Sequence, residues 1–286
     1  MTAATGAVKF LFRLSDRNCV EGVALPNTKK SWTFCISTQA GCGIKCGFCA
    51  SGKLGLTRNL ETHEIVEQVM WMKKTLGEVT NIVFMGVGEP FHNFDNVMAA
   101  IRLINDPQLA GIGARNITVS TSGVIEGIQK MSDVGEQIRL SVSLHFPWDD
   151  VRSRHMPVNR TNPLPQLMQA LREYQDKTKR LITFEYVLFR DLNDHLQAAD
   201  DLRKLLQGLD FKINLIPFNS VKGTPFHAPK EEKARKFLGH LLKKGVKATL
   251  RYKKGDDINA ACGQLRFIQS LDEPGCPEKK PSLKRG

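Results

Sequence analysis

The sequence predicts an α/β fold built on a parallel sheet, because short β-branched or apolar segments alternate with segments of helical periodicity. The 286 residues, 41% of them hydrophobic, are enough for one large domain or two small ones. Strands that alternate with helices are joined by crossover connections, which place the helices outside a parallel barrel or a doubly wound sheet.

Six segments have the composition of buried strands, and a seventh is a weaker candidate. The six are residues 32–37, 81–85, 116–120, 138–144, 181–189 and 211–217, and the weaker one is 247–252. Helical periodicity marks residues 61–76, 163–177, 194–209 and 230–244. In the first of these helices Ile65, Val69 and Met72 fall on one face, and acidic residues open the helix as its dipole favours.

No domain boundary is evident inside residues 10–268. We expect lead-in strands at 1–27, one core domain at 28–268, and a disordered basic tail rich in proline at 269–286. No apolar run approaches the roughly 20 residues that a membrane span needs. The N-terminus lacks the pattern of an export signal, so we expect a soluble, cytoplasmic protein.

The charge balance favours an anionic partner. The chain has 41 Lys and Arg against 29 Asp and Glu, a formal net charge of +12, which makes nucleic acid the first expectation. Many basic proteins bind no nucleic acid, so charge alone leaves the partner open. The residues that could neutralise phosphates near the strand ends, each of which could equally be a solvated charge, are Lys53, Arg58, Arg115, Arg152, Arg154, Arg160 and Arg190.

The cysteines indicate metal binding or catalysis. An odd number, seven, in a chain without an export signal argues against a disulfide framework. Cys42, Cys46 and Cys49 form a C-x3-C-x2-C run directly after the first predicted strand. Three thiolates on one tight loop can hold three irons of a 4Fe-4S cluster and leave the fourth open to a ligand. A zinc site with a fourth ligand, and coincidental buried thiols, are the alternatives.

Polar residues and glycines follow four of the predicted strands. They lie at residues 86–90, 120–123, 143–145 and 216–219. Parallel α/β sheets place their chemistry at the carboxyl ends of the strands, and glycine lets the backbone approach a ligand closely. The four segments therefore predict one shared site.

Together these motifs closely resemble the RlmN/Cfr family of radical S-adenosylmethionine (radical SAM) enzymes, which are RNA adenosine methyltransferases. The resemblance runs from about residue 9 to 267, through residues 35–42, 48–52, 58–60, 84–90, 117–121, 143–145, 184–186, 214–219 and 261–266. It implies an α/β fold of the incomplete (β/α)6 type, a TIM-like radical SAM barrel that is open on one side so that a large substrate can enter.

The resemblance implies two cofactors. Cys42, Cys46 and Cys49 would hold the 4Fe-4S cluster, whose open iron chelates S-adenosylmethionine, and two molecules of S-adenosylmethionine are used per turnover. Gly88 and Glu89 would meet the amino acid end of S-adenosylmethionine. The rest of its path would be lined by Ser120, Ser143, Leu144, His145 and Asn219. Taken alone, a serine or asparagine at such a position could equally cap a turn.

Three further residues acquire catalytic roles from the resemblance. An electrophilic adenine carbon cannot attack a sulfonium methyl, so the family passes the methyl through a cysteine and a radical. Cys262 matches the methyl-carrying cysteine, Cys35 the cysteine that resolves the covalent adduct, and Glu21 the proton acceptor. A solvated surface glutamate is the alternative interpretation of Glu21, and Cys19 and Cys276 have no assigned counterpart.

The implied function is methylation of adenosine C2 in 23S rRNA, with tRNA as a second substrate. C8 methylation of the antibiotic-resistance type, a radical SAM enzyme with a non-RNA substrate, and a non-catalytic RNA-binding or iron-sulfur protein are the alternatives. We expect RNA and an electron donor such as flavodoxin or ferredoxin as partners, and a monomer without membrane contact. Family members carry a helical RNA-binding domain before the barrel, whereas this chain starts almost at the barrel, so the target RNA is the least determined feature.

Overall fold

The computed structural model describes residues 1–27, 31–53, 55–221, 223–251, 258, 260–265 and 267–268. Its centre is a curved sheet, whose ten strands are counted over these residues and whose order is β1-β2-β3-β6-β7-β8-β9-β10-β11, with β12 beside β2. The expected tail at 269–286 lies outside the described residues.

The core of the sheet is a run of parallel strands that follow one another in chain order. They are β3 (Trp32–Cys35), β6 (Val79–Phe84), β7 (Ile117–Thr121), β8 (Arg139–Ser143), β9 (Ile182–Leu188), β10 (Phe211–Pro217) and β11 (Ala248–Leu250). A doubly wound sheet would reverse its strand order at a switch point, and no reversal occurs among these strands. The prediction of an incomplete TIM-like barrel is confirmed, and the weaker seventh strand is present.

Two antiparallel strands extend the sheet beyond β3. β1 (Val8–Arg13) pairs with β2 (Cys19–Pro26), and β2 pairs with β3 so that Val23 lies opposite Cys35. β12 (Phe267–Ile268) pairs with the start of β2, and a separate hairpin joins β4 (Gln39–Gly41) to β5 (Leu56–Asn59). In the described part of the chain, no pairing joins β11 to β1, so the barrel stays open.

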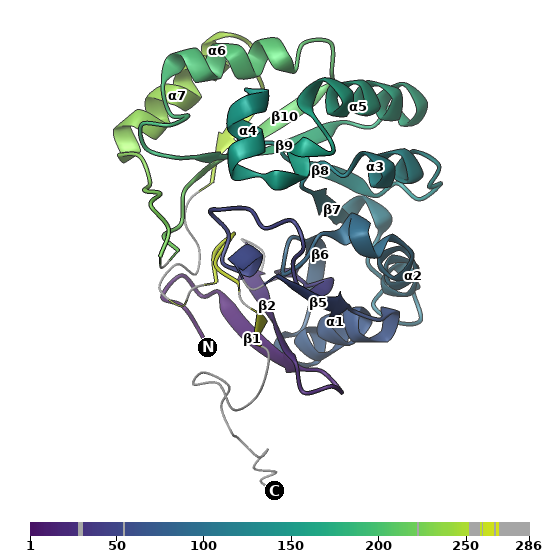
Figure 1. Ribbon diagram of the computed structural model, residues 1–286. Coiled ribbons are helices and arrows are strands. Elements are labelled where there is room, and N and C mark those ends of the chain that lie inside the picture. The colour runs from purple at the N-terminus through teal and green to yellow at the C-terminus, as the bar shows by residue number, and fades with distance from the viewer. Residues whose placement is uncertain are drawn as a thin grey trace, which may run out of the picture.

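Over the described residues, six helices cover the outer side of the sheet, namely α1 (Thr62–Leu76), α2 (Phe94–Asn105), α3 (Ile125–Ser132), α5 (Leu164–Thr178), α6 (Leu196–Leu205) and α7 (Glu231–Lys243). A further helix, α4 (Asp149–His155), lies against the ends of β7 and β8, where Arg152 donates to the carbonyls of Ser122 and Ser143. Figure 1 shows α1, α2, α3, α5, α6 and α7 following one another around the strands. Short 3-10 turns, η1 (Ser51–Lys53), η2 (Pro90–Asn93), η3 (Ala114–Asn116) and η4 (Pro157–Arg160), complete the connections.

Four of these helices were predicted to within four residues at each end. The predicted face of α1 is buried, since Ile65, Val69 and Met72 are inaccessible to solvent. Its start is fixed by a capping box between Glu61 and Glu64. The structure adds α2, α3 and α4, for which no helix was predicted from the sequence.

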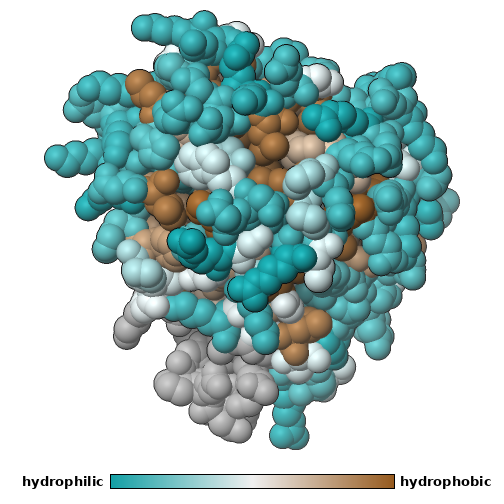
Figure 2. All heavy atoms as spheres, turned by 45° about the horizontal axis from the view of Figure 1, so that its top comes forward, coloured by the Kyte–Doolittle hydropathy of each residue, from teal (hydrophilic) through white to brown (hydrophobic). Residues whose placement is uncertain are grey.

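Hydrophilic residues predominate on the face shown in Figure 2, and hydrophobic residues form small separate patches there. Among the described residues, no helix combines the length and the apolar character that a membrane span requires.

We predict that Gly127→Ala destabilises the protein by about 1–3 kcal/mol, because a Cβ at this position of α3 would lie 2.3 Å from the ring of Phe91 in η2. Gly239→Ala in α7 is the matched control, since its Cβ would meet nothing within 4 Å, and alanine is the better helix former by up to about 1 kcal/mol. Urea unfolding of both variants measures the difference. Equal stability of Gly127→Ala and the unsubstituted protein would refute this packing of α3 on η2.

Candidate active site

One cavity of about 170 Å³ lies where the carboxyl ends of the core strands meet. Ten of the thirteen predicted site residues line it, namely Cys42, Cys46, Cys49, Gly88, Glu89, Ser120, Ser143, His145, Asn219 and Cys262. The other three, Cys35, Glu21 and Leu144, are not among the residues that line this cavity. The four strand-end segments that were predicted to form one shared site therefore lie around one cavity.

The loop that carries Cys42, Cys46 and Cys49 is held by backbone contacts at both ends. The amide of Cys42 donates to the carbonyl of Gly55 at 2.8 Å, and a Cβ on Gly41 would lie 2.0 Å from that oxygen. Gly41 has a φ of +87°, which favours glycine as well. At the other end the amide of Gly47 donates to the carbonyl of His155 in α4 at 3.0 Å. The loop is therefore fixed against the rest of the barrel.

An aromatic cluster anchors the middle of this loop. The ring of Phe48 lies 5.1 Å from that of Phe189 and 5.3 Å from the imidazole of His145, measured between ring centroids. Phe146 and Phe226 complete the cluster around Phe48. Because such contacts bury large apolar area, they hold the cysteine loop against the ends of β8 and β9.

Glu89 is held by the end of the neighbouring strand. The backbone amide and the hydroxyl of Ser122 both donate to its Oε2 at 2.7 Å, and the amide of Phe91 donates to its Oε1 at 3.2 Å. Gly88, before it, has a φ of +111°, and a Cβ there would lie 2.7 Å from Thr38 Oγ1. A glycine at this position lets the strand end approach the β4 segment closely.

His145 faces the cavity as a neutral imidazole. Burial, and after it the charge of Arg152, lowers the pKa of His145 to about 3. Its Nδ1 accepts a hydrogen bond from the amide of Val187 at 3.1 Å, so the proton of the neutral ring resides on Nε2. The φ of +58° at His145 turns the backbone sharply after β8. Next to it, the side chain of Leu144 is buried in the core, and this residue offers the site only its backbone.

Cys262 and Cys35 approach each other from opposite parts of the chain. The side-chain amide of Asn219 donates to the carbonyl of Cys262 at 3.1 Å, and the amide of Ala50 donates to the carbonyl of Gly263 at 2.9 Å. Cys262 is exposed on the cavity, whereas Cys35 is buried at the end of β3. Desolvation by the surrounding protein raises the pKa of both thiols, and the negative charge of Cys262 raises that of Cys35 further. The two sulfurs are therefore close enough to interact electrostatically.

Comparisons with known proteins show which family this chain resembles in sequence and fold. The profile of the radical SAM superfamily matches residues 36–202. A dual-specificity RNA methyltransferase RlmN from Syntrophotalea carbinolica is 45% identical over 281 residues, which cover 98% of this chain and 75% of that protein. A probable RlmN from Akkermansia muciniphila is 46% identical over 275 residues, or 93% of this chain and 77% of that protein.

The chain belongs to the RlmN family of radical SAM RNA methyltransferases. A crystal structure of a radical SAM methyltransferase from Sphaerobacter thermophilus matches with a TM-score of 0.89 and 42% identity, covering 93% of this chain and 79% of that one. SuiB of Streptococcus suis bound to S-adenosylmethionine shares the fold at a TM-score of 0.55 and 11% identity. Membership implies a 4Fe-4S cluster and S-adenosylmethionine.

The three cysteines suit a cluster better than a single zinc ion. Among the described residues, no group of three His, Cys, Asp or Glu could hold one metal ion. The irons of a cluster are spread in space, so their ligand sulfurs need not meet at one point. Burial raises the pKa of Cys42 to about 12 and that of Cys46 well above its usual range. Binding of iron supplies the positive charge that converts such thiols to thiolates.

Two buried oxygens in the cavity at the strand ends have no hydrogen-bond donor among the described residues. Glu185 Oε2 and Asn219 Oδ1 are inaccessible to water and have no partner among the described residues. Buried acceptors of this kind are costly unless a ligand satisfies them, and S-adenosylmethionine offers hydroxyl and amino donors. Glu185 was not predicted as a site residue. Its signal is a charged residue in the middle of the otherwise buried strand β9.

Glu21 is buried and ion-paired. Its carboxylate lies 2.9 Å from Lys9 Nζ on the adjacent strand β1, and the residue is 6% exposed. The alternative of a solvated surface glutamate is therefore wrong. Glu21 does not line the cavity, although its carbonyl accepts a hydrogen bond from Ser37 Oγ, two residues beyond Cys35.

Two of the proposed phosphate-binding residues are engaged in the protein instead. Arg58 donates to both oxygens of Glu64 at 2.8 Å and to Asp16 at 2.6 Å, and it lowers the pKa of Asp16 to about 2. Arg152 is completely buried and donates to backbone carbonyls. The sequence left open whether these two residues face phosphates or solvent, and the structure shows both bound to partners within the protein.

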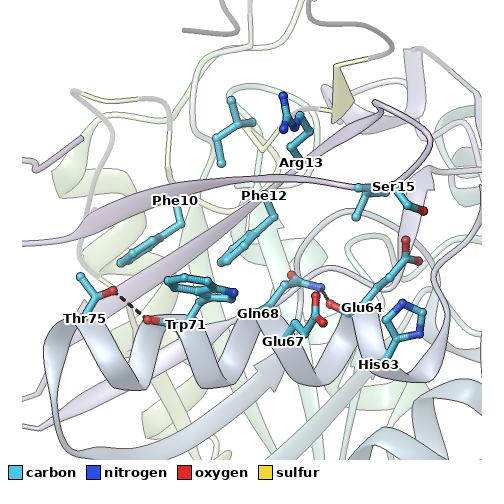
Figure 3. Close-up of a pocket in the computed structure, with 12 residues that line it drawn as sticks. Phe10, Phe12, Arg13, Ser15, His63, Glu64, Glu67, Gln68, Trp71 and Thr75 are labelled. Atoms are coloured by element: carbon cyan, nitrogen blue, oxygen red, sulfur yellow. Dashed lines mark hydrogen bonds between the residues drawn. The ribbon is translucent and has the colours of Figure 1, made fainter. Parts of the chain in front are cut away.

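A larger pocket of about 500 Å³ lies away from this chemistry, between β1 and α1. Figure 3 shows Phe10 and Phe12 from β1 facing Trp71, Gln68 and Glu67 from α1. It contains no cysteine and none of the predicted site residues. The smaller cavity is therefore the candidate active site.

We predict that His145 makes the protein acid-sensitive. In the unfolded chain His145 takes up a proton near pH 6.5, whereas in the folded protein it stays neutral down to about pH 3. The free energy of unfolding therefore falls as the pH drops through this window. Between pH 6.5 and 5 the free energy of unfolding, measured with urea, should fall by about 1–2 kcal/mol less in His145→Asn than in the unsubstituted protein. Asparagine tolerates the positive φ.

The exposed His63 provides the matched histidine substitution, and the change in pH dependence should be larger for His145→Asn than for His63→Asn. Identical pH profiles for His145→Asn and the unsubstituted protein would contradict a neutral buried imidazole.

Proposed function

We propose that this protein methylates C2 of an adenosine in 23S rRNA, and of an adenosine in tRNA, through a methylated cysteine. The observation that carries the proposal is that Cys262 lines the same cavity as the three cysteines of the cluster loop. Cys35, within electrostatic reach, supplies a second thiol. The names of relatives in the RlmN family support RNA as the substrate and dual specificity as its range.

In the proposed reaction, Cys42, Cys46 and Cys49 hold the cluster, and Gly88 and Glu89 bind the amino acid end of S-adenosylmethionine. When bound, the cluster supplies the electron that generates the 5′-deoxyadenosyl radical, and a flavodoxin or ferredoxin is the electron's source. His145 donates from Nε2, while Glu185 and Asn219 accept from hydroxyl or amino groups of the ligand. Ser120 and Ser143 complete the lining.

Cys262 acts first as a nucleophile. Its thiolate attacks the methyl group of one S-adenosylmethionine, forming an S–CH3 bond and releasing S-adenosylhomocysteine. Burial opposes the thiolate, and the guanidinium of Arg251 favours it, because this charge lowers the pKa of Cys262 and of Cys35. Arg251 lies 3.8 Å from Glu185, so the carboxylate keeps the cation beside the cavity.

Cys35 and Glu21 complete the proposed turnover, in which a second S-adenosylmethionine supplies the radical that removes hydrogen from the methyl on Cys262. The methylene radical adds to the ring carbon and joins Cys262 to the base, and the adduct would lose its ring proton to Glu21 and return one electron to the oxidised cluster. Cys35 then attacks the sulfur of Cys262, which breaks the bond between that sulfur and the methylene carbon and forms a transient disulfide. The released carbon takes up a proton and becomes the methyl group of the base. Reduction of the disulfide restores both thiols.

The test supplies S-adenosylmethionine with a labelled methyl group to the anaerobically reconstituted protein, a reductant, and unmodified ribosomal and transfer RNA. Mass spectrometry of the digested RNA should place the label on adenosine C2. Cys262→Ala should abolish labelling, Cys35→Ala should leave RNA bound covalently to the protein, and Cys19→Ala should react as the unsubstituted protein does.

Label at C8 would show that the protein methylates the other adenine carbon, and it would overturn the proposal of C2 methylation. Label on neither position, with the cluster intact and Cys262 methylated, would overturn these RNA substrates while leaving the methyl-carrying role of Cys262 in place.

A further inference from the structure

Arg152 in α4 is a completely buried cation without a carboxylate partner. Its side chain is inaccessible to solvent, and no ion pair to it is found in the described ranges. All of its acceptors are uncharged: Nε donates to the carbonyl of Leu144 at 3.2 Å, Nη1 to Asn159 Oδ1 at 2.7 Å, and Nη2 to the carbonyls of Ser122 and Ser143. A buried charge that is not neutralised is costly, so its retention calls for a counter-charge.

The surroundings of Arg152 point to where that counter-charge resides. The cysteine loop is tied to the same helix, since the amide of Gly47 donates to the carbonyl of His155. Nη2 of Arg152 donates to the carbonyls of Ser122 and Ser143, and both serines line the same cavity as Cys42, Cys46 and Cys49. Burial leaves the pKa of Arg152 at about 10, so the guanidinium is charged at neutral pH.

The carboxylate of Asp149 also acts on Arg152, but it is exposed and accepts its hydrogen bond from Asn159 rather than from the guanidinium. A Cβ on Gly123, in the turn after β7, would lie 3.1 Å from Nη2. The carbonyls that Arg152 holds belong to the ends of β7 and β8, and the amide of Ser122 on the same turn donates to Glu89. The cation is therefore fixed between two strand ends, on the side of the barrel that carries the cysteine loop.

We propose that Arg152 is the buried counter-charge of the iron-sulfur centre and a positioning residue that raises the reduction potential of that centre. Three thiolates make the centre anionic, and reduction adds one more negative charge, which a fixed nearby cation stabilises. The inference rests on the cluster site of the proposed function and not on the RNA target. Leu144, Ser122 and Ser143 hold the guanidinium, and their uncharged carbonyls leave its charge available to the cluster.

The competing role is purely structural, since Arg152 also ties the ends of β7 and β8 together. Arg152→Lys keeps the charge and loses most of the hydrogen bonds, whereas Arg152→Gln loses the charge. Arg154→Gln removes a charge from the exposed side of the same helix and is the matched control. A structural role would affect folding in both Arg152 variants, but it would not move the potential.

The experiment reconstitutes the cluster in the full chain, without RNA, and follows its reduction by electron paramagnetic resonance at controlled potential. In Arg152→Gln the ratio of reduced to oxidised cluster at the wild-type midpoint should fall by about tenfold, equal to about 59 mV for one electron. Arg152→Lys should stay within about twofold, although urea unfolding shows it to be less stable, and Arg154→Gln should match the wild type.

An unchanged midpoint in Arg152→Gln with a full cluster would overturn the inference. Should that variant fail to fold, Asn159→Asp decides, because it places a carboxylate on the guanidinium at the position of the 2.7 Å bond and leaves Arg152 in place. A lower reduced fraction in Asn159→Asp supports the inference, and an unchanged one refutes it. A wild-type protein that binds no cluster would refute the active-site assignment itself.

Discussion

Parallel strands that follow one another in chain order bring all their carboxyl ends to one edge of the sheet, and the site depends on that constraint. The cysteine loop follows β3, Glu89 follows β6, His145 follows β8 and Asn219 follows β10. Residues more than 170 positions apart in the sequence thus line one cavity of about 170 Å³. The segment with Cys262 completes the cavity because Asn219 and Ala50 hold its backbone.

Buried polar groups connect these strand ends. Ser122 donates twice to Glu89, and its carbonyl accepts from Arg152, which also holds the carbonyls of Ser143 and Leu144. Such networks are rigid when every member is satisfied, since an unpaired buried polar group is expensive. Two of the buried oxygens without a partner among the described residues face the cavity, one on Glu185 and one on Asn219.

Most of the fold and the cavity lining could be predicted from the sequence, because strand composition and chain order determine where the strand ends meet. Hydrophobic periodicity gave the buried face of α1, including Ile65 and Val69. The sequence could not show which charges are paired, so Arg58 and Arg152 stood among the possible phosphate-binding residues although both bind partners within the protein. Glu185 was missed because its buried surroundings exist only once β8, β9 and β10 are aligned. The roles of Cys35, Glu21 and Cys262 came from family resemblance, not from spacing.

The central claim is that Cys262, in the same cavity as the cluster cysteines, carries the methyl group. The most direct measurement incubates the reconstituted protein with trideuteromethyl S-adenosylmethionine, without RNA, and maps every cysteine-containing peptide by mass spectrometry. The account predicts a deuterated methyl group on Cys262 and none on Cys35 or Cys19. Label on another cysteine, or on none while the cluster is intact, would contradict it.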